Sequence, residues 1–193
     1  MNLTIKVPIK ASKEEKQILQ AYSKCFRDEV ERIASRYQTL KQVVFIPYKW
    51  ISSSIAFHSK TQVLHYAKIL YEEQKLDHKA IYHNSFSSMA KSLEISKNHI
   101  TFHFGQHFKV SQLRLSMMLH KQQSERLLQG ELVKADVKEI HNDFFAYLLI
   151  SIPQTIHNTM QNTDRKMGVD IGMRCPAVCY TCDGVIRFIG NGR

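Results

Sequence analysis

The sequence predicts an α+β fold: a small antiparallel β-barrel with an inserted helical segment, followed by a separate short run of strands. Apolar residues recur with helical spacing over most of residues 12–94. They alternate with strand spacing before and after that segment, and again after residue 166. With 193 residues, 44% of them hydrophobic, the chain can bury a core as one large domain or two small ones.

The chain is expected to begin with a strand and a long helix. Apolar and polar side chains alternate over residues 3–9, which predicts a half-buried strand, and Pro8 indicates an edge position. Ser12 and Glu15 have the spacing of a capping box that opens a helix. The apolar face of this helix consists of Ile18, Tyr22, Phe26, Val30, Ile33 and Tyr37. Two further segments have a helical pattern, residues 60–75 and 78–94.

Beyond Asn98 the pattern becomes that of strands, with turn residues at Asn142-Asp143. We expect strands near residues 100–104, 110–117, 131–140 and 144–152. After a polar stretch we expect three more, at residues 167–171, 177–181 and 185–189, the last two joined by a turn at Asp183-Gly184. The predicted domains are a β-barrel (1–10 and 98–153), a helical lobe (11–97), a linker (154–166) and the start of a further domain (167–193).

The chain is strongly basic. Its 27 Lys and Arg against 17 Asp and Glu give a formal charge of +10, with ten histidines not counted. The basic residues are spread along the chain, which favours a polyanionic partner such as nucleic acid over a merely solvated surface. There is no apolar run long enough to cross a bilayer and no signal peptide, so we expect a soluble, cytoplasmic protein without a membrane partner.

Asp170 is the strongest candidate for chemistry because it lies in a short apolar strand between Gly168 and Gly172. An unpaired carboxylate is costly there, and a metal ion or a phosphate is the usual reason for one. Carboxylate oxygens suit Mg²⁺, as in two-metal nucleases. Actin-like ATPases use a similar hairpin, but Met173 stands where they have Thr or Ser, which favours the nuclease. An aspartate in a strand-end turn without a ligand is the alternative.

Gly168-x-Asp170-x-Gly172, followed by Pro176-Ala177-Val178 and Asp183-Gly184, resembles the first RuvC motif of the transposon-encoded TnpB proteins, relatives of the type V CRISPR nucleases. The order of the preceding elements is also similar. Residues 130–137 and 144–150 resemble the last two barrel strands of that family. Only the final segment is specific, although the similarity in order extends over the whole chain.

The resemblance implies the N-terminal part of an RNA-guided DNA endonuclease that binds guide RNA and target DNA. The barrel would be a wedge domain, the helices a recognition lobe, and residues 167–193 the start of an RNase H-like (RuvC) domain in which Asp170 is a catalytic Mg²⁺ ligand. Two features depart from the family: a slightly longer hairpin between Ala177 and Asp183, and Asn191-Gly192-Arg193 where a proline is common.

The same resemblance places the family's remaining carboxylates and its zinc-ribbon cysteines beyond Arg193. Because one carboxylate cannot form a two-metal centre, we expect this chain alone not to cleave DNA, and a separate C-terminal nuclease portion would be its partner. The alternatives are a cleavage-dead regulator that binds RNA or DNA and, more distantly, a fragment of an actin-like ATPase.

The candidate nucleic-acid contacts are Lys13, Lys16, Arg27, Lys49, Trp50, Lys60 and Lys109. Tyr48, Trp50 and Phe57 form an aromatic group that can stack on bases, although such residues often belong to a core, and a solvated face also explains the basic ones. Zinc is disfavoured. Cys175, Cys179 and Cys182 lack a second pair of ligands, and His99, His103 and His107 lie in a strand-like segment that Gly105 interrupts.

Overall fold

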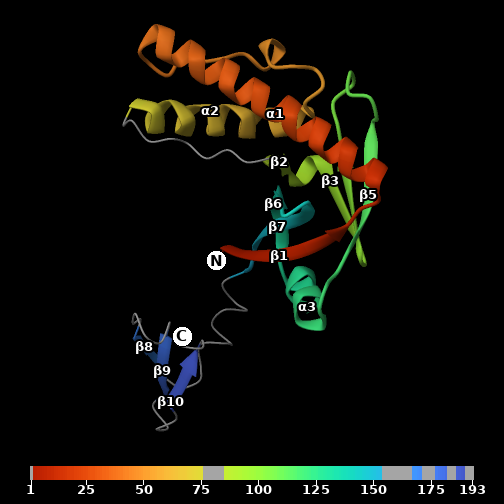
Figure 1. Ribbon diagram of the computed structural model, residues 1–193, viewed down its shortest axis with the longest axis vertical. Helices are drawn as coiled ribbons and strands as arrows, with labels where there is room; N and C mark the ends of the chain where they lie inside the picture. The colour runs from red at the N-terminus through yellow and green to blue at the C-terminus, as the bar shows by residue number, and fades with distance from the viewer. Residues whose placement is uncertain (1, 76–84, 154–166, 171–176, 182–185, 190–193) are drawn as a thin grey trace. The chain divides into compact units, whose positions relative to one another are not determined.

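The computed structural model describes residues 2–75, 85–153, 167–170, 177–181 and 186–189 (Figure 1). They belong to two compact units, Met1–Ile152 and Pro153–Arg193. The first unit contains, in chain order, β1 (Asn2–Lys10), α1 (Lys13–Leu40), the 3₁₀ turns η1 (Tyr48–Trp50) and η2 (Phe57–Ser59), α2 (Lys60–Lys75), β2 (Ser85–Met89), the 3₁₀ turn η3 (Ala90–Ser92), β3 (Leu93–Ser96), β4 (His99–His103), β5 (Gln112–Met117), α3 (Lys121–Gln129), β6 (Glu131–Ile140) and β7 (Asp143–Ser151). The second contains β8 (Met167–Asp170), β9 (Ala177–Thr181) and β10 (Ile186–Ile189). The α+β class predicted from the sequence is therefore confirmed.

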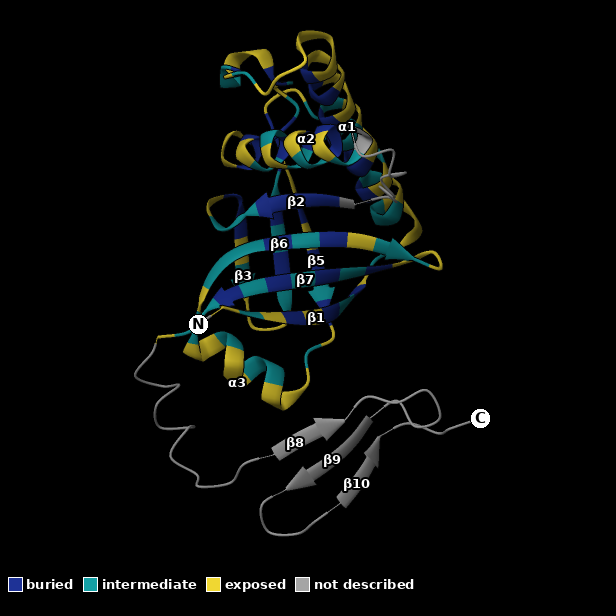
Figure 2. Ribbon diagram, turned by 90° about the vertical axis from the view of Figure 1, so that its left-hand side faces the viewer, coloured by how far each residue is buried: buried dark blue, intermediate teal, exposed yellow. Residues whose placement is uncertain are grey.

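The described strands of the first unit form one antiparallel sheet of seven strands in the order β2-β6-β7-β1-β5-β4-β3. β1 pairs with β7 along almost its whole length, from Asn2 opposite Ser151 to Ile9 opposite Phe144. The pairs between described strands leave the sheet open, with β2 and β3 at its edges, so the predicted barrel is present only as an antiparallel sheet. Buried and less buried residues alternate along β6, β7 and β1 (Figure 2), as a sheet with one face on the core requires.

One hydrophobic core holds the sheet and the two long helices together. The sheet contributes the buried face of β1 and β7, and α1 contributes large side chains such as Tyr22 and Phe26. Burying one Leu, Ile or Phe side chain stabilises a fold by about 1.5–3 kcal/mol, so this core fixes α1 and α2 against the sheet. The predicted capping box is confirmed: the Glu15 amide donates to Ser12 Oγ, and the Ser12 amide donates to Glu15 Oε2.

The helix predicted over residues 78–94 is wrong where the structure describes that segment. Phe86, Met89 and Leu93 have helical spacing, yet β2, η3 and β3 occupy residues 85–96. β2 pairs with β6, from Ser85 opposite Lys138 to Met89 opposite Lys134. Pairing with a strand distant in sequence thus overrides the local pattern. α3, which begins after His120 with a capping box to Gln123, has no counterpart in the sequence prediction.

Pro8 also needs a correction, because β1 lies in the middle of the sheet rather than at its edge. The strand accepts a proline because its pairing with β5 includes only Ile9 and Lys10, which leaves most of that side without a ladder. The carbonyl of Lys6 on this side accepts a hydrogen bond from Gln123 Nε2 of α3 at 3.0 Å. None of the helices in the described parts of the chain is long and apolar enough to span a membrane.

The second unit contains a three-stranded antiparallel sheet in the order β10-β9-β8. Asp170 is the last residue of β8, and its backbone lies opposite Val178 of β9. The three strands agree closely with those predicted. The linker at 154–166 and the turn at Asp183-Gly184 lie outside the described residues.

Candidate nucleic-acid interface

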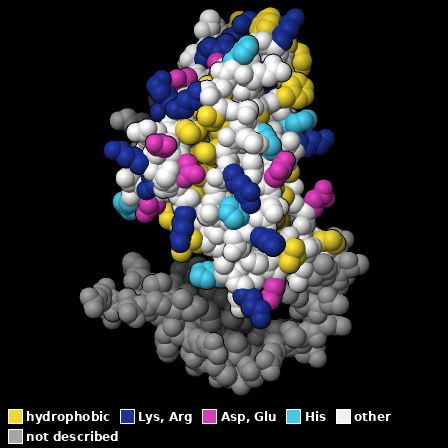
Figure 3. Space-filling view, turned by 90° about the vertical axis from the view of Figure 1, so that its right-hand side faces the viewer, with side chains coloured by type: hydrophobic (Ala, Val, Ile, Leu, Met, Phe, Trp, Pro, Cys, Tyr) yellow, Lys and Arg dark blue, Asp and Glu magenta, His cyan; other side chains and the backbone are white. Residues whose placement is uncertain are grey.

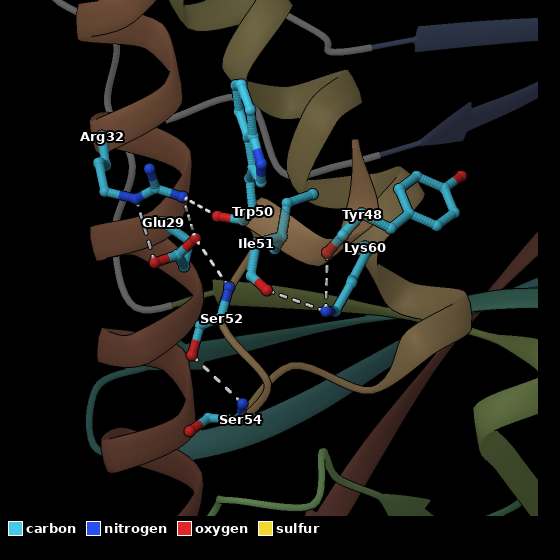
Figure 4. Close-up of polar contacts among 8 residues, drawn as sticks. All are labelled: Glu29, Arg32, Tyr48, Trp50, Ile51, Ser52, Ser54 and Lys60. Carbon is cyan, nitrogen blue, oxygen red and sulfur yellow. Dashed lines mark hydrogen bonds and ion pairs between the residues drawn. The ribbon is translucent and has the colours of Figure 1, made fainter. Parts of the chain in front are cut away.

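The segment between α1 and α2 is held in a fixed conformation by an ion pair on α1 (Figure 4). The Glu29 carboxylate accepts from Arg32 Nη2 at 2.8 Å and from the Ser52 amide at 3.1 Å. Arg32 Nη2 also donates to the Trp50 carbonyl at 2.7 Å. Charge-assisted hydrogen bonds of this kind are strong, so η1 and the residues after it are positioned by α1 rather than free to move.

Lys60 supports the same segment from the other side. Lys60 is only 8% exposed, and its Nζ donates to the carbonyls of Tyr48 at 3.0 Å and Ile51 at 2.9 Å. Burial lowers the pKa of the Lys60 ammonium, an effect that the negative charge of Glu29 opposes. The sequence indicated Lys60 as a nucleic-acid contact, but this geometry directs its charge toward the protein backbone.

The aromatic side chains of this segment are displayed at the surface. Trp50 is 47% exposed, Phe57 62% and Phe45 87%. The Tyr48 ring packs edge-on against Phe57 with centroids 5.5 Å apart, and the Arg36 guanidinium lies 4.8 Å from the centre of the Trp50 ring. Exposed rings beside basic groups are typical of surfaces that stack on bases. Nothing in the sequence pattern singled out Phe45.

Two long stretches of the chain lack acidic residues, and the structure brings them together. No Asp or Glu occurs in residues 32–71 or in residues 95–124. The loop between β4 and β5 (104–111) meets the segment between the helices where the Gly105 amide donates to the Ser54 carbonyl at 2.9 Å. Ser53 Oγ and His107 Nδ1 are 2.6 Å apart at the same junction. We call residues 43–58 together with 104–111 the basic loop surface.

The basic loop surface carries Lys49 on one loop and Lys109 on the other, and both are exposed. Figure 3 shows the side of the first unit that is on the right in Figure 1. Lysine, arginine and histidine side chains are spread over it, with acidic ones among them, and hydrophobic side chains lie between them, several at the upper end. Such a combination suits a partner that presents both phosphates and bases.

The remaining predicted contacts lie elsewhere on α1. Lys13 and Lys16 are at its start, about 24 Å and about 20 Å along the helix from Glu29. There they line a shallow pocket with Gln20 and Asn142, and Lys16 Nζ donates to the Asn142 carbonyl at 2.7 Å. Lys16 also pairs with the exposed carboxylate of Asp143 at 3.1 Å. Arg27 is half-buried and has no side-chain partner among the described residues. Of the seven predicted contacts, Lys49, Trp50 and Lys109 belong to the basic loop surface, and Lys60 beside it donates to the carbonyls of Tyr48 and Ile51.

The described residues contain no group of three or more His, Cys, Asp or Glu that could hold a metal ion. Two of the three histidines that the sequence raised as zinc candidates have separate partners: His103 lies 3.0 Å from Glu94, and His107 contacts Ser53. Asp170 alone supplies one carboxylate, which is fewer than a Mg²⁺ site in a nuclease requires. Cys175 and Cys182 lie outside the described residues.

No protein-family model matches this chain, and no curated protein matches it either.

Proposed function

We propose that this chain binds RNA and DNA as the N-terminal part of a TnpB-like RNA-guided nuclease. The observation that carries the proposal is the basic loop surface, where two acid-free segments meet and present Lys49, Lys109 and exposed aromatic rings. Lysines neutralise phosphates, and exposed rings stack on unpaired bases. Both features are needed by a protein that holds a folded RNA together with an opened DNA duplex.

The arrangement of elements supports the same proposal. Along the chain, α1 and α2 come between β1 and the other strands of the antiparallel sheet, and a separate three-stranded sheet follows. We assign the seven-stranded sheet to a wedge domain, α1 and α2 to a recognition lobe, and β8–β10 to the first strands of a RuvC-like domain. Asp170 would be a Mg²⁺ ligand once further carboxylates complete the site.

The first prediction is salt-dependent binding to structured RNA in a gel-shift experiment. Neutralising phosphates releases counterions, so the affinity should fall steeply between 50 and 200 mM salt, by about 100-fold for roughly four phosphate contacts. The double variant Lys49→Gln/Lys109→Gln should lower the salt slope by about 2, since each lysine accounts for about one phosphate. A cleavage-dead regulator would bind in the same way, so this result tests the function that both hypotheses share.

A matched control is available on the two long helices. Lys24 and Lys68 are exposed and each pairs with an acidic residue four positions later, Asp28 and Glu72. Lys24→Gln/Lys68→Gln removes the same charge as the test variant and should change the salt slope less. Absence of binding at low salt would overturn the proposal. Equal salt slopes for the two double variants would show that the interface lies elsewhere than on the basic loop surface.

The second prediction uses Trp50, the only tryptophan of the chain. If bases stack on it, saturating single-stranded RNA should quench its fluorescence, and Trp50→Ala should weaken binding about tenfold. Trp50→Phe keeps an aromatic face and should bind nearly as well as the wild type. Unchanged emission at saturation would show that bases do not reach this ring.

A further inference from the structure

A second aromatic surface lies on the outer face of the sheet, on strands β1, β6 and β7. Along β7, Phe144, Ala146 and Leu148 are buried in the core, so the alternate residues Phe145 and Tyr147 project from the opposite face, where they are half-buried. Figure 2 shows β6, β7 and β1 toward the viewer with no described helix in front of them. This face is not part of the basic loop surface.

Lysines from the two neighbouring strands flank the rings. Lys6 of β1 lies opposite Tyr147, and Lys138 of β6 lies opposite Phe145. The Lys6 ammonium is 4.4 Å from the centre of the Phe145 ring, and that of Lys138 is 5.4 Å from the centre of the Tyr147 ring. We call Lys6, Lys138, Phe145 and Tyr147 the aromatic–lysine face.

The two ammonium groups contact only aromatic rings among the residues that the structure describes. The neighbouring Lys134 differs, because it pairs with Asp136 at 3.0 Å. Burial alone would lower the pKa of Lys134, but the hydrogen bond and charge of Asp136 raise it on balance. The carboxylate of Asp136 is further held by the Tyr66 hydroxyl at 3.2 Å. The acidic group on this side is therefore already compensated, and the positive charge of Lys6 and Lys138 is not.

We infer that the aromatic–lysine face binds two successive unpaired bases of a single-stranded nucleic acid. Rings on alternate residues of one strand lie about 7 Å apart along it, and other β-sheets use such pairs to stack bases. A cation–π contact at an exposed site is weaker than a base stack, so the lysines can leave the rings and contact the flanking phosphates. An apolar protein partner would instead bury two unpaired charges. The inference rests on the proposed function and adds to it a site and a class of ligand.

The test compares two fluorescein-labelled DNA strands of equal length with the full chain. One is oligothymidylate, and the other has the same phosphates but abasic residues. The variant Phe145→Thr/Tyr147→Thr removes both rings and keeps residues that favour strands. It should bind oligothymidylate about tenfold more weakly while its affinity for the abasic strand stays unchanged. Quenching of Trp50 should persist, which separates this site from the basic loop surface.

Two controls make the outcome interpretable. Phe145→Tyr/Tyr147→Phe preserves both rings and should bind oligothymidylate like the wild type. Lys6→Gln/Lys138→Gln should weaken binding to both strands equally, because the lysines contact phosphates. The melting temperature of each variant checks that the sheet remains folded.

Wild-type affinity for oligothymidylate in the threonine variant would overturn the inference. An equal loss of affinity of this variant for both DNA strands would also overturn it. So would a change from dimer in the wild type to monomer in the variant, which would show that the face is a contact between copies of the chain. In these three outcomes the protein still binds nucleic acid, and the proposed function stands. Absence of binding to every strand and to structured RNA would instead remove the proposed function itself.

Discussion

Replacement of Gly105 by alanine is expected to destabilise the protein by about 3 kcal/mol. A Cβ atom at this position would lie 2.0 Å from the Ser53 carbonyl oxygen and 2.4 Å from the Ser54 carbonyl carbon. Both are backbone atoms, so no change of rotamer relieves the overlap, and the two loops must separate. The hydrogen bond from the Gly105 amide to the Ser54 carbonyl is then lost as well.

Urea unfolding measures the effect, and Gly130→Ala provides the matched control. A Cβ on Gly130 would meet Ile150 Cδ1 and the Ser151 carbonyl oxygen at 3.1 Å, a contact that a shift of a few tenths of an ångström relieves. That variant should lose less than about 1 kcal/mol, because alanine also reduces the entropy of the unfolded chain. Equal losses at the two glycines would contradict the close approach at Gly105.

The same substitution links stability to the candidate interface. Gly105 joins the two acid-free segments, so its replacement should move Lys109 away from Lys49 and reduce RNA affinity beyond what unfolding explains. A folded Gly105→Ala protein that binds RNA like the wild type would show that the junction does not matter for binding. The measurement is the gel shift at a temperature where the variant remains folded.

Local patterns predicted most of the strands and helices because burial in this fold follows the period of each element. The capping box at Ser12 and the alternation along residues 3–9 and 144–152 belong to elements whose neighbours lie on one continuous core. β2 was missed for a different reason. Its apolar residues fit a helix as well as a strand, and only pairing with β6 decides between them.

The candidate site was predictable in its composition but not in its geometry. The absence of acidic residues over 32–71 and 95–124 is visible in the sequence. The contact between these two segments is not visible in the sequence, since it depends on a backbone hydrogen bond between loops about 50 residues apart. Local sequence likewise does not show where the Lys60 charge is directed, because burial by η1 is a tertiary feature. Phe145 and Tyr147 lie beside Lys6 and Lys138 only through the register of β7 with β1 and β6.

A second large effect is expected at Lys60. Lys60→Met keeps an unbranched side chain, one atom shorter, but removes the Nζ that donates to the carbonyls of Tyr48 and Ile51. The Tyr48 carbonyl keeps its hydrogen bond from the Ile51 amide at 3.1 Å, whereas the Ile51 carbonyl is left unsatisfied, which should cost about 2 kcal/mol in urea unfolding. Lys68→Met makes the same change on an exposed position of α2, where the pair with Glu72 is worth about 0.3 kcal/mol. A comparable loss for both variants would show that the Lys60 hydrogen bonds contribute little.

The pH dependence of the same pair of proteins gives an independent test. Burial lowers the pKa of Lys60 in the folded state, so between that pKa and the ordinary lysine value of about 10.4 the unfolded chain binds more protons. Stability from this group is therefore lowest below the folded pKa and rises with pH through the window. The neutral amine still donates to both carbonyls. Wild type should gain stability relative to Lys60→Met as the pH is raised toward 10, and an opposite slope would mean that the folded protein favours the charged lysine.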